Sequence, residues 1–177
     1  MKKNGNSRKT PRAKWIDYDA GVFFITICTY GRVHYFGEIE NGKMKLSPIG
    51  EIVTNELSYP SLHHSEIEIP LFVVMPNHLH AIIDVKCDNP VKDQPAEQRN
   101  LIPSLRANYN MERDVPTLSK YIASFKSAVS REAHLICREF RWQSRYHDHF
   151  IRNERELNMI SEYILNNEAR WDKDCFY

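Results

Sequence analysis

The sequence predicts an α+β domain in which a small antiparallel sheet carries helices on one face. Three observations lead to this prediction. Residues 21–29 are rich in β-branched and aromatic types, as strands are. Residues 66–86 hold two apolar segments joined by a tight Met-Pro-Asn turn. Two later segments, 117–139 and 154–170, have apolar residues at helical spacing. At 177 residues, the chain has the length of one domain with a substantial core.

Two stretches stand apart from this domain in composition. The first fourteen residues carry six Lys or Arg and no acidic residue, although the net charge of the chain is only +1. We predict a basic flexible arm over residues 1–14 and a single domain over residues 15–177. Such an arm can attract phosphate, or it can be a solvated tail with no ligand. Residues 87–115 are polar and contain several prolines, which predicts a long surface insertion.

The first half of the domain contains a hairpin and a helix after the strand at 21–29. Residues 35–46 are predicted to form the hairpin, because Asn41-Gly42 is a strong two-residue turn signal. Ser47 is then expected to cap a helix that has Pro48 at its first position. The apolar positions of this helix keep helical spacing; they are Ile49, Ile52, Val53 and Leu57.

The second half begins with two strands, at about 66–75 and 78–86. A helix is predicted over 117–139, with Thr117 as its N-cap and an apolar stripe along one face. Residues 142–150 are expected to be irregular, aromatic and basic.

The last helix is predicted over about 154–170. Asn153 and Glu156 form a pattern like a capping box at its start. Its buried positions are expected to be Leu157, Ile160, Ile164 and Leu165.

Composition excludes several classes of protein. No apolar stretch approaches 20 residues, and the N-terminal residues lack the apolar centre of a secretory signal, so we expect a cytoplasmic protein. The four cysteines are far apart and form no CxxC pair, which argues against a zinc knuckle or a redox motif and favours reduced thiols. They are Cys28, Cys87, Cys137 and Cys175.

The pair His78 and His80 is the most informative feature of the chain. Residues i and i+2 of a strand point to the same face, so both imidazoles are expected to lie side by side. Two imidazoles on a rigid strand make half of a metal site. On the last helix, Tyr163 and Asn167 are four residues apart and share a face. If that face meets the histidine strand, two nitrogens and one amide oxygen surround a cation, a donor set that favours Mg²⁺ or Mn²⁺.

In such a site, Tyr163 would be a nucleophile beside a metal-bound phosphate. Free phenol has a pKa of roughly 10 and attacks poorly at neutral pH, so the metal would neutralise the phosphate and polarise the P–O bond. Two other histidine pairs are weaker candidates. His147 and His149 flank a charged residue, and His63-His64 are neighbours whose side chains diverge on any regular element.

Four segments together resemble the REP-associated tyrosine transposases, which belong to the single-tyrosine HUH transposases (HUH denotes histidine-hydrophobic-histidine). The resemblance extends from about residue 21 to 176, with the insertion outside it. The segments that carry it are Val73-Val74-Met75-Pro76-Asn77-His78-Leu79-His80, Phe125-Lys126-Ser127, residues 142–154 and Tyr163-Ile164-Leu165-Asn166-Asn167.

The resemblance implies a ferredoxin-like α+β core with the HUH motif on a central strand and the tyrosine on a C-terminal helix. It implies a divalent metal held by His78, His80 and Asn167, with Tyr163 as the nucleophile. The substrate would be single-stranded DNA folded into palindromic hairpins. Relatives encoded by insertion sequences act as dimers that exchange tyrosine helices, whereas REP-associated members act as monomers, so both states are open here. Glu168 stands where the family usually has proline, which predicts a longer final helix.

Hairpin binding would combine phosphate contacts with base stacking. Trp142 and Tyr146 are the candidates for stacking, although core packing is the somewhat favoured explanation of Trp142. The candidates for phosphate contacts are Lys2, Lys3, Arg8, Lys9, Arg12, Lys126, Arg131, Arg145 and Arg152.

The principal hypothesis is thus a metal-dependent transposase and endonuclease that cleaves and rejoins hairpin DNA through a phosphotyrosine. One alternative is a domesticated hairpin-binding regulator without cleavage, which would need none of the site residues. Another is a rolling-circle replication initiator, which shares the HUH site but is usually longer. A hydrolytic metal enzyme is a more distant alternative, since Asp84 is the only carboxylate near the histidines.

Overall fold

A computed structural model describes residues 16–60, 64–86 and 115–173. The arm residues Lys2, Lys3, Arg8, Lys9 and Arg12 and all but the last residue of the predicted insertion lie outside these ranges. The elements, in chain order, are β1 (Gly21–Cys28), η1 (Tyr30–Arg32), β2 (Gly37–Glu40), β3 (Lys43–Leu46), α1 (Pro48–Ser58), β4 (Ile67–Met75), β5 (His78–Val85), α2 (Thr117–Ile136), β6 (His147–Phe150), α3 (Glu154–Leu165) and η6 (Glu168–Lys173).

The main sheet has the strand order β4-β5-β1-β6, and every neighbouring pair is antiparallel. The predicted α+β class is confirmed. The histidine strand β5 lies between β4 and β1, and Tyr163 lies on the C-terminal helix α3, as expected. Setting the β2–β3 hairpin aside, the order of strands and helices is that of the ferredoxin-like core.

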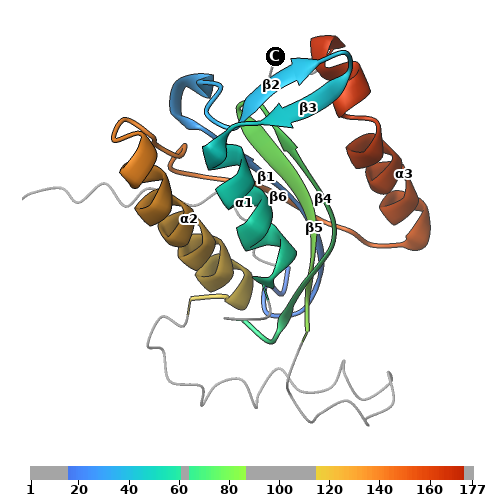
Figure 1. The fold of residues 1–177 in the computed structure, drawn as a ribbon. Helices are drawn as coiled ribbons and strands as arrows, with labels where there is room; N and C mark the ends of the chain where they lie inside the picture. Colours follow the sequence, from blue (N-terminus) through green and yellow to red (C-terminus); the bar gives the residue numbers. More distant parts are fainter. Residues whose placement is uncertain (1–15, 61–63, 87–114, 174–177) are drawn as a thin grey trace, which may run out of the picture.

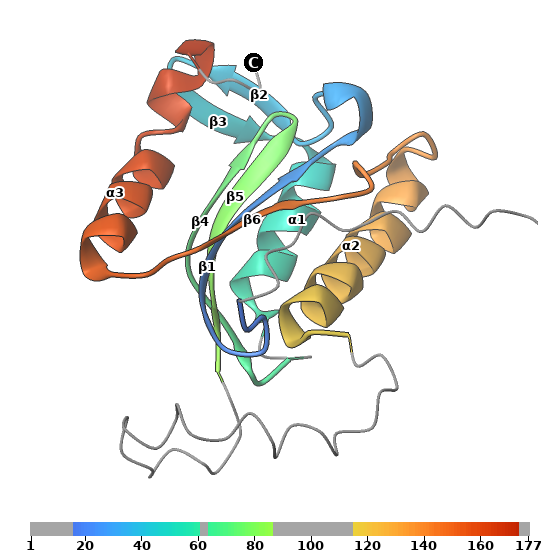
Figure 2. The ribbon, with the colours of Figure 1, turned by 180° about the vertical axis from the view of Figure 1, so that it is seen from behind.

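The helices cover both faces of this sheet, and the prediction that all lie on one face is wrong for α3. Figures 1 and 2 show α1 and α2 on one side and α3 on the other. The main core lies between the sheet and α1 and α2. A smaller cluster, built around Ile82, Ile151 and Ile164, joins the opposite face to α3. The burial of β5 agrees with helices on both faces of the sheet. Its residues are almost all buried, as expected for a strand covered on both faces.

The hairpin and the start of α1 agree with the sequence prediction. Asn41 and Gly42 have φ angles of 53° and 73°, so the turn twists in the sense that closes a two-residue hairpin. The side chain of Ser47 accepts a hydrogen bond from the Gly50 N–H at 3.1 Å, and Pro48 is the first helical residue.

Four expectations about the second half are wrong. Leu165, expected to be buried, is 69% exposed at the end of α3. Thr117 is not the N-cap of α2; Pro116 occupies that position, and the Asp19 carboxylate accepts hydrogen bonds from the N–H and the hydroxyl of Thr117. The residues expected to be irregular include the edge strand β6, which pairs with β1. The final helix is shorter than expected, because α3 ends at Leu165 and a separate 3-10 helix, η6, follows.

No helix among the described residues is long and apolar enough to span a membrane.

The first turn of α1 gives a test of the packing. A Cβ at Gly50 would collide with the carbonyl oxygen of Phe36, a backbone atom that cannot move away by a change of side-chain rotamer. We expect Gly50→Ala to lower the free energy of unfolding by about 1–3 kcal/mol, as overpacking does, measured by urea denaturation. Asn55→Ala, on the exposed side of the same helix, should change it by less than about 0.5 kcal/mol. Equal midpoints for the two variants would contradict this account of the contact.

Candidate functional site

The two histidines of β5 converge in the middle of the sheet. His78 is 0% exposed and His80 is 1% exposed, and both face the side that α3 covers. Their Nε2 atoms are 3.1 Å apart. The strand alternation therefore brings both imidazoles to one point, as the sequence predicts.

The Nδ1 atom of each imidazole lies within hydrogen-bond distance of a polar side chain. Asn77 Oδ1 lies 2.9 Å from His78 Nδ1, and Thr26 Oγ1 lies 2.8 Å from His80 Nδ1. Asn77 is itself anchored, because its Nδ2 donates to the Arg32 carbonyl oxygen at 3.3 Å. Partners on Nδ1 fix the orientation of both rings and direct their Nε2 atoms to the shared point. Thr26 belongs to no sequence motif that points to the site, because its register opposite His80 is set only by strand pairing.

His78 is held in its neutral form. Burial, aided by the positive charge of Arg32, lowers the pKa of His78 to about 3. The Asn77 Oδ1 atom can only accept, so the proton of the neutral ring lies on Nδ1. His78 Nε2 then carries a lone pair toward His80, which is the state that a metal ligand requires.

Tyr163 reaches this point from α3 of the same chain. Its hydroxyl lies 3.1 Å from His80 Nε2. The ring makes edge contacts with His80 and with Phe24, at centroid distances of 5.2 and 6.1 Å. The side of α3 that carries Leu157, Ile160 and Ile164 packs on the sheet and sets the position of the helix. Tyr163 is still 39% exposed, so a ligand can approach the hydroxyl from solvent.

Asn167 follows the end of α3 and is 2% exposed. Its N–H donates to the Ile164 carbonyl at 3.2 Å, and its carbonyl accepts from the Arg170 N–H at 3.1 Å, so the backbone is firmly placed. Its side-chain Oδ1, by contrast, is buried and has no hydrogen-bond partner among the described residues. A buried amide oxygen without a partner is costly, which points to a ligand that it accepts.

An open cleft of about 420 Å³ lies beside the tyrosine, lined by Tyr163, Asn167, Arg170 and Lys173. Arg170 and Lys173 were not among the residues predicted for the site. They stand in η6, whose first residues were predicted as the end of the last helix.

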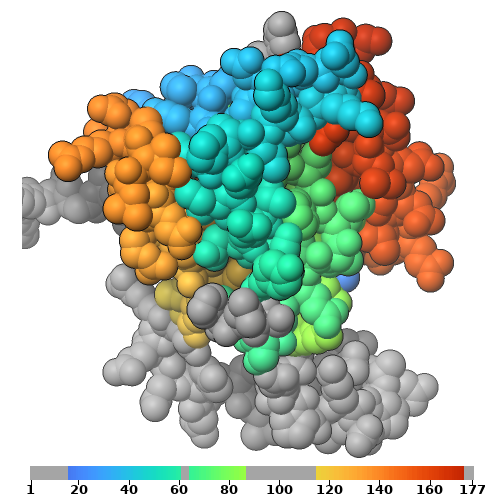
Figure 3. All heavy atoms as spheres, in the orientation of Figure 1, coloured from blue at the N-terminus to red at the C-terminus, as the bar shows by residue number. Residues whose placement is uncertain are grey.

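Trp171 was also missed. It is 8% exposed, and its ring stacks on His78 at 5.9 Å and meets the His34 ring edge-on at 5.7 Å. The segment η6 packs against β3, and the space-filling view in Figure 3 shows these two segments together at one end of the molecule. Trp171 therefore ties the segment that follows the tyrosine helix to the histidine strand.

These donors fit a divalent cation. Two ligand atoms at right angles on one ion, each about 2.1 Å from it, are about 3 Å apart, which matches the separation of the two Nε2 atoms. Asn167 Oδ1 adds a buried oxygen without a partner of its own among the described residues. Within the same part of the chain, no group of three or more His, Cys, Asp or Glu side chains is placed to hold a metal, so a third protein ligand would have to be of another type, such as the Asn167 amide, which lines the cleft together with Tyr163.

The other histidine pairs lie elsewhere. His149 is on the edge strand β6 and contacts Glu156 Oε1 at 2.6 Å. His64 pairs with Glu66 at 3.3 Å and packs on Tyr121. His63 lies outside the described residues.

Two residues predicted to contact DNA are built into the fold. The Lys126 ammonium donates to the Gln143 carbonyl at 2.6 Å and lies 5.8 Å from the centre of the Trp142 ring. The Trp142 Nε1–H donates to the Lys126 carbonyl at 3.1 Å, and the ring packs against the main core. Burial lowers the pKa of Lys126. These contacts give both side chains a structural role.

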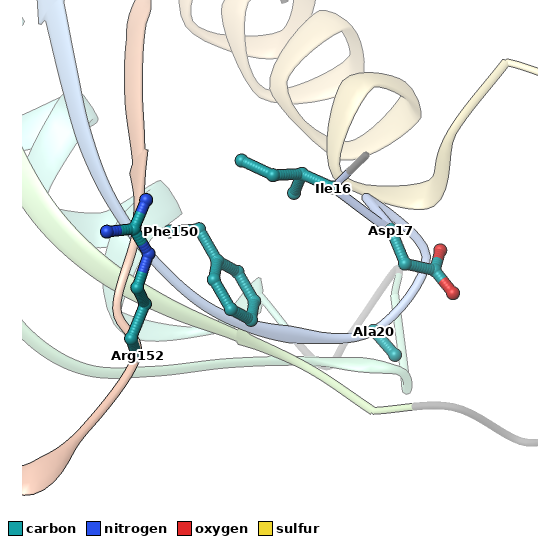
Figure 4. Close-up of a pocket in the computed structure, with 5 residues that line it drawn as sticks. All are labelled: Ile16, Asp17, Ala20, Phe150 and Arg152. Atoms are coloured by element: carbon teal, nitrogen blue, oxygen red, sulfur yellow. The ribbon is translucent and has the colours of Figure 1, made fainter. Parts of the chain in front are cut away.

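The remaining candidates lie nearer the surface. Arg131 and Arg145 are exposed, and the Tyr146 hydroxyl lies 3.4 Å from that of Ser119. Arg152 borders a second cavity of about 340 Å³ at the start of β1, where Phe150 supplies an aromatic wall (Figure 4). Neither Tyr163 nor Asn167 lines that cavity, so it is separate from the cleft beside the tyrosine.

Comparison with known proteins gives three findings. No protein-family model matches the chain. An uncharacterized protein of Haemophilus influenzae (strain Rd) is 33% identical over 173 residues, which cover 96% of this chain and 93% of that protein. The solved structure of a REP-associated tyrosine transposase bound to a REP hairpin superposes with a TM-score of 0.60 at 16% identity, over 92% of this chain and 74% of the other. The chain therefore belongs to one family with the Haemophilus influenzae protein, and it has the fold of the REP-associated tyrosine transposase, in agreement with the resemblance of its motifs.

Proposed function

We propose that this protein is a transposase of the single-tyrosine HUH type, which binds single-stranded hairpin DNA and cleaves and rejoins it through Tyr163. One observation carries the proposal: the Tyr163 hydroxyl, on α3, lies 3.1 Å from Nε2 of His80, whose ring is paired with that of His78. A pure binding protein would need none of these three side chains at one point.

The chemical step is a phosphodiester exchange. The Tyr163 oxygen attacks a backbone phosphorus, a new O–P bond forms, and the P–O bond to one sugar oxygen breaks. The phenol proton is balanced by the proton that the leaving sugar oxygen takes up, so one DNA end becomes a free hydroxyl. The other end is held as a phosphotyrosine. Attack by a second hydroxyl reverses the exchange, and no ATP is consumed.

His78, His80 and Asn167 are the residues that would hold a divalent cation, Mg²⁺ or Mn²⁺. When bound, such an ion neutralises the phosphate and polarises the scissile bond. The chain's own contribution is position. The Asn77 and Thr26 side chains orient the two imidazoles, and the Phe24 ring supports both His80 and the tyrosine ring.

The fold relative bound to a REP hairpin supports hairpin DNA as the substrate class. The basic residues of the N-terminal arm and the exposed Arg131, Arg145 and Arg152 remain candidates for contacts with its backbone.

The direct experiment uses single-stranded oligonucleotides with the palindromes that flank this protein's gene. We expect a protein–DNA adduct that survives denaturation when the protein is incubated with Mn²⁺ or Mg²⁺. EDTA should prevent it, and the same sequences annealed as full duplexes should give none. Tight hairpin binding without an adduct under either metal would reject the transposase hypothesis and favour a hairpin-binding regulator without cleavage.

Thr26 offers a test of the metal site that does not depend on DNA. We expect Thr26→Val to weaken Mn²⁺ binding by about 10–100-fold, the usual effect of losing the group that orients a ligating histidine. Isothermal titration calorimetry would measure the affinity, and ¹⁵N NMR of the His80 ring would report which nitrogen carries the proton. Thr54→Val, on α1, is the matched control, because its hydroxyl donates to the Gly50 carbonyl of its own helix. Equal Mn²⁺ affinities for the two variants would remove Thr26 from the site.

A further inference from the structure

We propose that the cleft beside Tyr163 is a nucleotide-sized subsite in which Arg170 and Lys173 hold the backbone phosphate next to the one that the tyrosine attacks. This inference rests on the proposed function, and it names a part of the substrate site that the sequence motifs do not include.

The cleft has the size and composition of such a subsite. Its volume of about 420 Å³ lies within the roughly 300–1,000 Å³ of ordinary ligand sites. The described residues that line it are Tyr163, the buried Asn167 and the two basic residues Arg170 and Lys173. The acidic residues of the same segment, Glu168 and Asp172, do not line it. Among the described residues, the lining of the cleft thus holds two positive side chains and no carboxylate, a composition that attracts an anion.

The charged side chains of Arg170 and Lys173 are available for a ligand. Both are exposed, and neither makes an ion pair with another of the described residues. The backbone beneath them is nonetheless well placed. The Arg170 N–H donates to the Asn167 carbonyl at 3.1 Å, and Trp171, the next residue, is buried against His78. The segment therefore presents two charged side chains from a position that is fixed relative to the histidines.

Backbone phosphate is the favoured ligand because of where the cleft opens. The half-exposed Tyr163 is part of its wall, so a DNA strand whose phosphate reaches the hydroxyl must continue past it. A flexible single strand can place its adjacent phosphate between Arg170 and Lys173, since such contacts need charge and reach rather than base identity.

The test measures binding in the Tyr163→Phe background, where no covalent product forms. Fluorescence anisotropy with a labelled single-stranded dT20 probe gives the affinity over a range of NaCl concentrations. For single strands, removing one phosphate-binding cation reduces the slope of log K against log[salt] by about 0.7, so Arg170→Ala with Lys173→Ala should reduce it by about 1.4. Lys43→Ala with Arg155→Ala removes the same charge from exposed positions outside the cleft and should leave the slope unchanged. Arg170→Lys should keep the slope of the parent.

Adduct formation with the gene-flanking palindromes separates this inference from the proposed function. In proteins that retain Tyr163, the cleft pair of substitutions should slow the adduct at least about 10-fold, and the control pair should not. An unchanged slope and an unchanged rate in the cleft variant would overturn the subsite while leaving the tyrosine chemistry intact. Competition by inorganic phosphate as strong as that by dT20 would assign the cleft to a free anion and would also overturn it. If the unaltered protein formed no adduct, the proposed function would be refuted, whatever the salt dependence of DNA binding in the variants.

Discussion

Tyr163→Phe is expected to abolish the covalent protein–DNA adduct and to leave hairpin binding within about twofold of the parent protein. The substitution removes only the hydroxyl oxygen, which is the atom proposed to attack phosphorus. The ring keeps its edge contacts with Phe24 and His80, so the shape of the site survives. Removing the hydrogen bond to His80 costs on the order of 1 kcal/mol of stability, too little to unfold a domain. Denaturing gels would score the adduct, and peptide mass spectrometry would locate the phosphotyrosine.

Tyr59→Phe is the matched control. Tyr59 is 63% exposed at the end of α1, on the opposite face of the sheet from α3, and its hydroxyl has no place in the proposed chemistry. It should form the adduct at the rate of the parent. An adduct that persists in Tyr163→Phe would mean that another side chain is the nucleophile. Loss of hairpin binding together with the adduct would instead make Tyr163 a structural residue.

His80→Ala is expected to lower Mn²⁺ affinity by more than about 100-fold and to stop adduct formation. This effect should exceed the 10–100-fold expected for Thr26→Val, because the proposed ligand itself is removed rather than the group that orients it. His80 is buried, so the alanine variant also leaves a cavity. His80→Gln retains most of the volume and should still lose the metal affinity. Calorimetry with Mn²⁺ and thermal unfolding of each variant would separate the two effects.

His147→Ala gives the control for this experiment. It alters the other histidine-x-histidine pair, on an exposed position of β6, and Thr26 lies between it and His80 in the sheet. We expect normal Mn²⁺ affinity and normal adduct formation. If His147→Ala abolished metal binding and His80→Ala did not, the metal centre would have to be moved to the edge strand.

Prediction from sequence succeeded where a few neighbouring residues decide the structure. Asn41-Gly42 forms its turn because two adjacent residues adopt positive φ angles. Ser47 caps α1 through a hydrogen bond to a residue three positions away. His78 and His80 share a face because a strand alternates.

Prediction failed where contacts between segments that are distant in the sequence decide the local structure. Thr117 looked like an N-cap, but the helix start is capped by Asp19, almost a hundred residues earlier. The strand β6 has no alternating apolar pattern of its own, and its conformation comes from pairing with β1. The face covered by α3 depends on where the chain leaves β6, which helical periodicity does not specify.

The sequence by itself determined the class of the fold, the histidine strand and the tyrosine helix, because periodicity and capping are local properties of the chain. Only the tertiary structure decided that Tyr163 meets His80, 83 residues away, that Thr26 and Asn77 orient the two rings, and that Trp171 holds η6 against His78. These contacts arise from strand register and from helix packing on a shared sheet. The free energy that selects such contacts comes from packing over the whole core. No single segment of the sequence therefore specifies them.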